Sequence, residues 1–188
     1  MTIRRSAILA ASIAGLAVLV VARWARTGAP VGVYIDDGFY AILGRALATG
    51  HGLSYIGWPG APAPSHYPPG YPLLLAMLWR LGGSVDAVAR WGEWINAGAL
   101  AIAAALVAAA LRLRFGIAPW IAAPAAVLGA VATPVLAVST LLLSEACFLL
   151  LLVLVLWMAD RSGATAGRLG WAVAAGALAG TAALVRTI

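Results

Sequence analysis

Long apolar runs separated by short polar stretches dominate the sequence. A membrane-crossing helix needs about 20 mostly apolar residues, and measured against that length the runs predict about five transmembrane helices. The apolar run over 117–159 is too long for one crossing, and the proline and hydroxyl residues between Thr133 and Thr140 predict a bend within it. The predicted spans are residues 6–22, 94–111, 117–133, 140–159 and 169–188.

The segment between the first two spans, residues 23–93, contains a first short helix. Apolar residues at helical spacing predict this helix over 38–49, and Gly50 supplies its stop. Asp36 or Asp37 is the expected N-cap, because a carboxylate there accepts a free backbone N–H. The amphipathic pattern indicates a helix that lies in the membrane interface.

A proline-rich stretch and a second short helix follow. Six prolines between Pro59 and Pro72 exclude helix and central strand, and they stiffen the backbone. Pro72 suits the first turn of a helix over "LLLAMLWRL", which ends at Gly82 and Gly83. At roughly ten residues this helix is too short to cross a bilayer. We therefore expect two juxtamembrane helices in the first extracytoplasmic loop.

Composition agrees with a membrane protein. The chain is 64% hydrophobic and 10% charged, with a mean hydropathy of +1.00, whereas soluble domains are about 45–50% apolar. The expected fold class is an all-α integral membrane protein, with 1–188 as one transmembrane domain. Because the last apolar run has no polar exit before Ile188, we expect this to be the amino-terminal portion of a longer protein.

The charges predict orientation. The basic residues are all Arg, with no compact cluster or basic helix of the kind that binds nucleic acid, so no nucleic-acid partner is expected. Arginines flank alternate span ends, which predicts a cytoplasmic amino terminus and an extracytoplasmic 23–93 segment. These arginines are Arg4, Arg5, Arg112, Arg114, Arg161 and Arg168.

This threading brings distant polar residues to one face. Asp36 and Asp37 follow the first span, Glu145 is expected about five residues inside the fourth, and Arg186 closes the fifth. A carboxylate within a span usually faces a bundle interior or a watery cavity, so Glu145 needs a partner. A cap accounts for one aspartate. The other, near Tyr40, is free to act as a base or to bind a cation.

Other polar residues have structural explanations. His51 lies between Gly50 and Gly52 and suits a turn. Arg90 and Glu93 are one turn apart and suit an interfacial ion pair. Asn96, within the second span, suits a hydrogen bond between helices.

Four stretches together resemble the amino-terminal half of GT-C membrane glycosyltransferases, the broad group that includes bacterial protein O-mannosyltransferase-like enzymes and the lipid A aminoarabinose transferase. Each stretch carries polar residues at an expected span end or in the first loop, and together they cover most of the chain in order. They are "YIDDGFYAILGRALATGHG", "HYPPGYPLLLAMLWRLGG", "LLLSEACFLLLLVLVLW" and "GALAGTAALVRT".

The resemblance implies roles for these residues. Asp36 and Asp37 match the acidic pair, with Asp36 as catalytic base or metal ligand. Glu145 is similar to a second acid that binds the metal or holds the acceptor, and Arg186 resembles the residue that grips a lipid phosphate. The substrate-binding candidates are Tyr40, His66, Tyr67 and Arg186. The sequence departs from the family at the Asp-Asp pair, where Asp-Glu is common, and at His66 and Tyr67, where some relatives carry Lys.

The implied activity is inverting transfer of a sugar from a polyprenyl-phosphate donor to a lipid, glycan or protein acceptor. It would take place at the extracytoplasmic face of a bacterial-type inner membrane. Arg186, or a divalent metal ion bound by Asp36 and Glu145, would stabilise the departing phosphate. Two alternatives remain, a transporter component and a non-catalytic membrane subunit.

Overall fold

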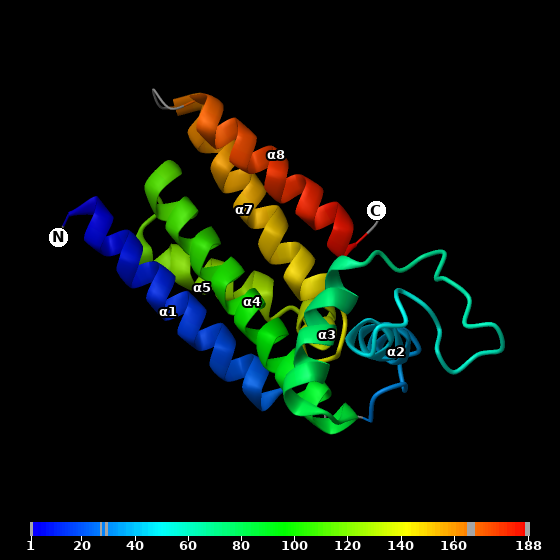
Figure 1. The fold of residues 1–188 in the computed structure, drawn as a ribbon. Helices are drawn as coiled ribbons and strands as arrows, with labels where there is room; N and C mark the ends of the chain where they lie inside the picture. Colours follow the sequence, from blue (N-terminus) through cyan, green and yellow to red (C-terminus); the bar gives the residue numbers. More distant parts are fainter. Residues whose placement is uncertain (1, 27, 29, 165–167, 187–188) are drawn as a thin grey trace.

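The protein is all-helical within the residues that the computed structural model describes, which are 2–26, 28, 30–164 and 168–186. These ranges contain eight α-helices and no strand (Figure 1), as the sequence predicts. In chain order the helices are α1 (Ile3–Trp24), α2 (Asp36–Ala48), α3 (Gly70–Gly82), α4 (Val85–Arg114), α5 (Pro119–Ala130), α6 (Thr133–Ser139), α7 (Glu145–Ala164) and α8 (Arg168–Val185).

Four helices, α1, α4, α7 and α8, are long and apolar enough to cross a membrane. The pair α5 and α6 passes the same test only when taken together, and it is bent by 66°. The structure therefore supports a membrane protein with four or five spans. Residues 187 and 188, with which the predicted fifth span ended, lie outside the described residues.

The bend predicted between Thr133 and Thr140 is present, but the run breaks twice, just before this stretch and again from Thr140. The chain breaks at 131–132, and the Thr133 and Pro134 pair opens helix α6 instead of ending a helix. Proline is tolerated in the first helical turn because its missing N–H has no intrahelical partner there. Residues 140–144 form the link to α7, so the span predicted over 140–159 begins at Glu145.

The second span also starts earlier than predicted. Helix α4 covers 94–111 but begins at Val85, because the Ser84 side chain accepts a hydrogen bond from the Ala87 N–H and caps the helix. The expected ion pair of Arg90 with Glu93 is wrong as well. Glu93 pairs with Arg26, which ties the segment after α1 to α4.

Small residues hold the centre of the bundle together. Helix α1 packs along α4, and α5 packs against both. Without a hydrophobic driving force between helices in lipid, close backbone approach supplies the attraction, and alanine permits it. The buried seam consists of Ala10, Ala14, Ala108, Ala123 and Ala126.

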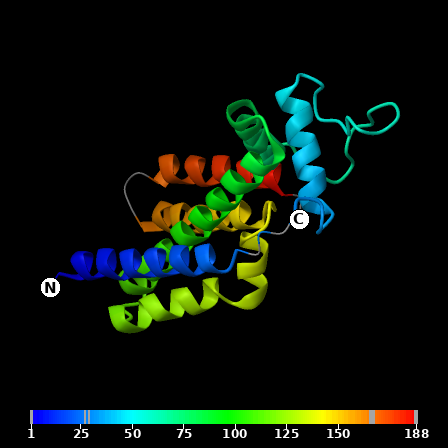
Figure 2. The same ribbon diagram turned by 90° about the horizontal axis from the view of Figure 1, so that it is seen from below.

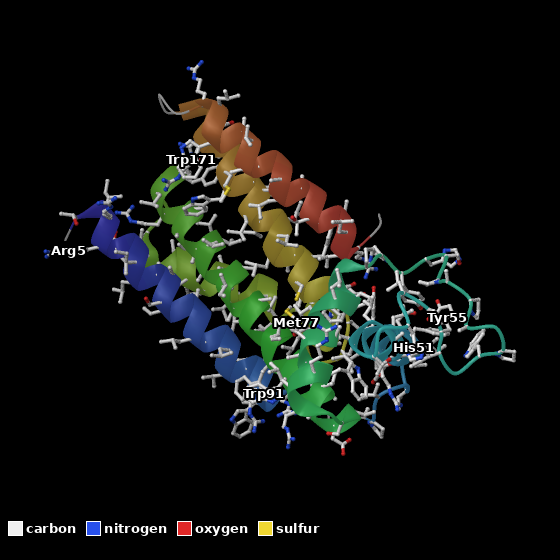
Figure 3. All side chains as sticks on the ribbon, in the orientation of Figure 1. Arg5, His51, Tyr55, Met77, Trp91 and Trp171 are labelled. Atoms are coloured by element: carbon white, nitrogen blue, oxygen red, sulfur yellow. The ribbon has the colours of Figure 1, made fainter. Side chains whose placement is uncertain are left out.

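The span ends alternate between two ends of the bundle. At one end Arg112 donates a hydrogen bond to Ser6 and Arg114 pairs with Asp160, so the start of α1 and the ends of α4 and α7 lie together. Figure 3 shows Trp171 at this end and Trp91 at the opposite end. Tryptophans at both ends of a bundle are typical of interfacial anchors.

The opposite end carries a platform, by which we mean α2, α3 and the connecting residues 49–69. Helix α2 lies across the direction of the long helices (Figure 2). It packs closely on α3, since a Cβ on Gly44 would lie 2.8 Å from the Leu75 Cβ, and Trp79 Nε1 donates to the Ala41 carbonyl at 3.0 Å. The two short helices predicted over 38–49 and after Pro72 are thus present.

Asn96 connects the platform to the bundle. It is fully buried in α4, and its Nδ2 donates to the Leu141 and Leu143 carbonyls at 2.7 and 2.8 Å. The same amide contacts the Tyr71 hydroxyl of α3 at 3.1 Å. The predicted role of Asn96 as an interhelical hydrogen-bonding residue is confirmed, and the residue fixes the link before α7.

Gly70 offers a test of how the platform closes on α8. A Cβ at this position would lie 2.6 Å from the Leu184 carbonyl oxygen. Overpacking of this kind costs about 1–3 kcal/mol, so Gly70→Ala should lower the thermal unfolding midpoint in detergent. Gly180→Ala, on α8 with nothing within 4 Å, should leave the midpoint unchanged or raise it slightly. Equal midpoints for the two variants would contradict this packing.

Candidate functional site

The two aspartates at the start of α2 have different surroundings. Asp37 is 3% exposed. Its Oδ2 accepts the Gly32 N–H at 2.8 Å, and its Oδ1 accepts the Gly38 and Tyr34 N–H groups at 2.9 and 3.2 Å. Both oxygens are therefore occupied by backbone donors. We assign Asp37 the structural role and leave Asp36 as the available carboxylate.

Neither aspartate is the N-cap that the sequence predicts. Both lie in the first turn, and the residue before the helix is Ile35, with φ 64° and ψ −66°. The Asp36 N–H donates to the Tyr34 carbonyl at 2.7 Å, so Ile35 is the centre of a rare and strained γ-turn. A β-branched residue with positive φ is an outlier, and such strain concentrates at functional sites. The Asp37 hydrogen bonds hold this turn in place.

Asp36 faces the proline-rich part of the platform. The Tyr67 hydroxyl donates to its Oδ1 at 2.5 Å. Burial raises the pKa of Tyr67, and the negative charge of Asp36 raises it further. Tyr67 therefore stays protonated near neutral pH and remains a donor to Asp36.

Tyr40 continues the chain of contacts towards the bundle. Its ring packs edge-on against Tyr67 and Tyr71, with ring centroids 5.1 and 5.0 Å apart. Its hydroxyl is 2.9 Å from the Ser144 hydroxyl, on the link before α7. Burial raises the pKa of Tyr40, which also feels the charges of Glu145, Arg186 and Asp36. Tyr40 is 5% exposed and joins Tyr67 and Tyr71 to Ser144 through these contacts, and its predicted role in substrate binding stays a prediction.

Glu145 and Arg186 meet as an ion pair. Arg186 Nη1 lies 2.6 Å from Glu145 Oε1. The expectation that Glu145 has a partner is confirmed, but its position five residues inside a helix is wrong, because it is the first residue of α7. At that end of a helix the macrodipole also favours a negative charge.

The second carboxylate oxygen of Glu145, Oε2, is buried and has no hydrogen-bond partner among the described residues. Glu145 also borders a small cavity of about 230 Å³ that is otherwise apolar. Its other lining residues are Leu100, Val135, Val138, Ala146, Phe148 and Leu149. A buried acceptor with no partner is rare in native structures and calls for an explanation, such as a ligand or an ordered water.

The two histidines, His66 and His51, differ in their hydrogen bonding. His66 is exposed, and within the described ranges its ring makes no hydrogen bond or ion pair. His51 bonds to Thr49 Oγ1 through Nδ1 at 2.9 Å, in the turn that the sequence predicts. Ser144 is part of the site because its hydroxyl contacts the Tyr40 hydroxyl. No sequence pattern predicts this contact.

The described side chains do not by themselves form a complete metal cage. No group of three His, Cys, Asp or Glu side chains gathers in the part of the chain that the structure describes. Asp37 is engaged by backbone N–H groups and Glu145 Oε1 by Arg186. Mg²⁺ takes about six oxygen ligands, of which water and substrate phosphate commonly supply most. A metal held by Asp36 and Glu145 therefore stays a prediction, and the roles proposed below for these residues do not depend on it.

A double-mutant cycle tests the ion pair. Arg186→Ala and Glu145→Gln remove the same interaction, so their effects on unfolding free energy should be non-additive. Because the side chains are 41% and 26% exposed, screening limits the expected coupling to about 1 kcal/mol. Chemical unfolding in detergent measures it. Additive effects would mean that the two side chains do not meet.

The raised pKa of Tyr67 gives a pH prediction. The unfolded phenol titrates near 10.0 and the folded one higher, so this contribution to stability is complete below pH 10 and is lost as pH rises above it. Tyr67→Phe should remove one titrating group and flatten the decline by about 1.4 kcal/mol per pH unit at most. Unfolding midpoints between pH 8 and roughly 11 measure the slope. Identical slopes for wild type and variant would refute the assignment.

Comparison of the chain with protein-family models, with curated proteins and with solved structures finds no match. The helices and contacts of the described residues support a membrane protein with a polar site where the platform meets α7 and α8.

Proposed function

We propose that the protein transfers a sugar from a polyprenyl-phosphate donor to an acceptor hydroxyl at the platform end of the bundle. The supporting observation is one continuous series of contacts. Asp36 bonds to Tyr67, Tyr67 packs on Tyr40, and Tyr40 bonds to Ser144. Ser144 precedes Glu145, which pairs with Arg186.

The chemistry requires a base at one end of this series and a cation at the other. Asp36 accepts the proton of the acceptor hydroxyl as that oxygen attacks the anomeric carbon. The bond from this carbon to the donor phosphate breaks, and the polyprenyl phosphate leaves with the electron pair. Arg186, whose side chain is 41% exposed, pairs with the developing charge. One displacement inverts the anomeric centre.

The surroundings of Glu145 suit a lipid-linked donor. Its unpartnered Oε2 accepts a sugar hydroxyl, and the apolar cavity beside it receives part of the isoprenoid chain. Tyr67, fixed as a donor to Asp36, orients the base. The arginine distribution favours a cytoplasmic amino terminus, and we propose on that basis that the site faces the extracytoplasmic side of the membrane, a bacterial-type inner membrane as the family resemblance implies.

The bent pair α5 and α6 favours a second candidate, a transporter component. Broken helices form substrate sites in many transporters. Here the break at 131–132 has no ionisable residue, whereas the charged groups lie at the platform end. That placement favours transfer over transport.

Asp36→Asn provides the central test. With the full chain in membranes and a labelled polyprenyl-phosphate sugar, we expect sugar transfer to fall about 100-fold or more, the size of a general-base contribution. The thermal unfolding midpoint should hold, because Asp36 accepts no backbone N–H in the described structure, unlike Asp37.

Asp86→Asn is the matched control. Asp86 is an exposed acid in the first turn of α4, away from the contact series, so transfer should stay at the wild-type rate. Unchanged transfer in Asp36→Asn would refute Asp36 as the base. Movement of the labelled lipid across the membrane without transfer would favour the transporter.

A further inference from the structure

A second cavity lies at the other end of the platform from Asp36. It has a volume of about 480 Å³ and forms where α2 and α3 end and α4 begins. Figure 1 shows this junction, with α3 running from the end of α8 to the start of α4. The lining residues are Arg45, Ala48, Thr49, Trp79, Arg80, Gly83, Ser84 and Val85. None belongs to the contact series from Asp36 to Arg186.

The charge of this cavity is positive and uncompensated. Arg45 and Arg80 both line it and both are exposed. In the described part of the chain, neither guanidinium lies within 4.0 Å of a carboxylate or donates a hydrogen bond to the protein. Each guanidinium carries five N–H donors in a planar fork that suits phosphate oxygens.

Two contacts restrain one side of the cavity. The Arg45 guanidinium stacks over the Trp79 ring at 5.7 Å, and Trp79 Nε1 donates to the Ala41 carbonyl at 3.0 Å. Stacking and the hydrogen bond restrict both side chains before any ligand arrives. Restricted side chains lose less conformational entropy on binding.

Arg45 and Arg80 lie in the last turns of α2 and α3, where a cation complements the helix dipole. This explains why each helix ends with a basic residue. It does not explain why two arginines share one cavity without an acid. The carbonyls at the end of α2 are already engaged, since Thr49 Oγ1 bonds to the Arg45 and Ala46 carbonyls. The guanidinium donors thus remain available.

The depth at which the cavity would lie in a bilayer indicates the class of its ligand. Helix α4 starts at the cavity rim, and Trp91 and Trp94 follow on its next turns, partly or largely exposed. Tryptophans mark the head-group level of a bilayer. A phosphate held there sits at the depth of phospholipid head groups.

We propose that this cavity binds the phosphate of an anionic phospholipid, clamped between Arg45 and Arg80 against Trp79. The site is separate from the sugar-transfer site and stands whether or not that function holds. Two guanidinium groups on one phosphate give charge-assisted hydrogen bonds, which are stronger than neutral ones.

The test uses the full chain in nanodiscs of phosphatidylcholine containing a minor fraction of phosphatidylglycerol, with native mass spectrometry of the lipids retained. Wild type should retain phosphatidylglycerol over phosphatidylcholine. Arg45→Ala and Arg80→Ala should each reduce that preference about tenfold, the factor that one charge-assisted contact of about 1.4 kcal/mol gives. The Lys variants at both positions keep the charge and should retain part of the preference.

Arg90→Ala is the matched control, because Arg90 is an exposed arginine on α4 that does not line the cavity. It should keep the wild-type preference. An equal loss in Arg90→Ala, or none in the Arg45 and Arg80 variants, would overturn the proposal. Millimolar inorganic phosphate distinguishes the source: retention that resists it supports the lipid head group, and displacement by it overturns the lipid in favour of free phosphate.

Discussion

The hydrogen bonds of one buried amide underlie the arrangement of this protein. Residues 140–144 are not helical, so the carbonyls of Leu141 and Leu143 have no helical N–H partner, whereas the Ser144 carbonyl accepts the Phe148 N–H of α7. Asn96 supplies two donors from α4, to Leu141 and Leu143. It thereby fixes Ser144 and the start of α7. The positions of Glu145 and of the Tyr40 contact depend on this link.

The candidate site lies where two separately built parts meet. The bundle contributes Glu145 and Arg186 from the ends of α7 and α8, while the platform contributes Asp36, Tyr40 and Tyr67. Close approach of Gly70 to α8 brings the parts together. Because neither part holds the whole contact series, its geometry depends on packing between helices far apart in the chain. The basic cavity at the far end of α3 depends on the same platform.

The adjacent aspartates show how local sequence leaves roles undecided. From sequence, either residue is an acceptable cap, and both have the same chemistry. In the structure, the γ-turn at Ile35 directs Asp37 into three backbone N–H groups and leaves Asp36 to Tyr67. A difference of one residue in backbone direction thus separates a structural carboxylate from an available one. The cap prediction failed because the strained turn before α2 has no recognisable sequence pattern.

The sequence by itself determined the membrane class, most of the long helices, both short platform helices and the alternation of basic span ends. These features follow from apolar length, periodicity and charge, which act locally. Only the tertiary structure decided that the chain breaks at 131–132 and that Glu93 pairs with Arg26. It also decided that Glu145 is the first residue of α7 and pairs with Arg186. It alone brought Arg45 and Arg80 to one cavity. Such outcomes depend on which distant side chains compete for a charge or a buried donor, and that competition exists only once the helices have packed.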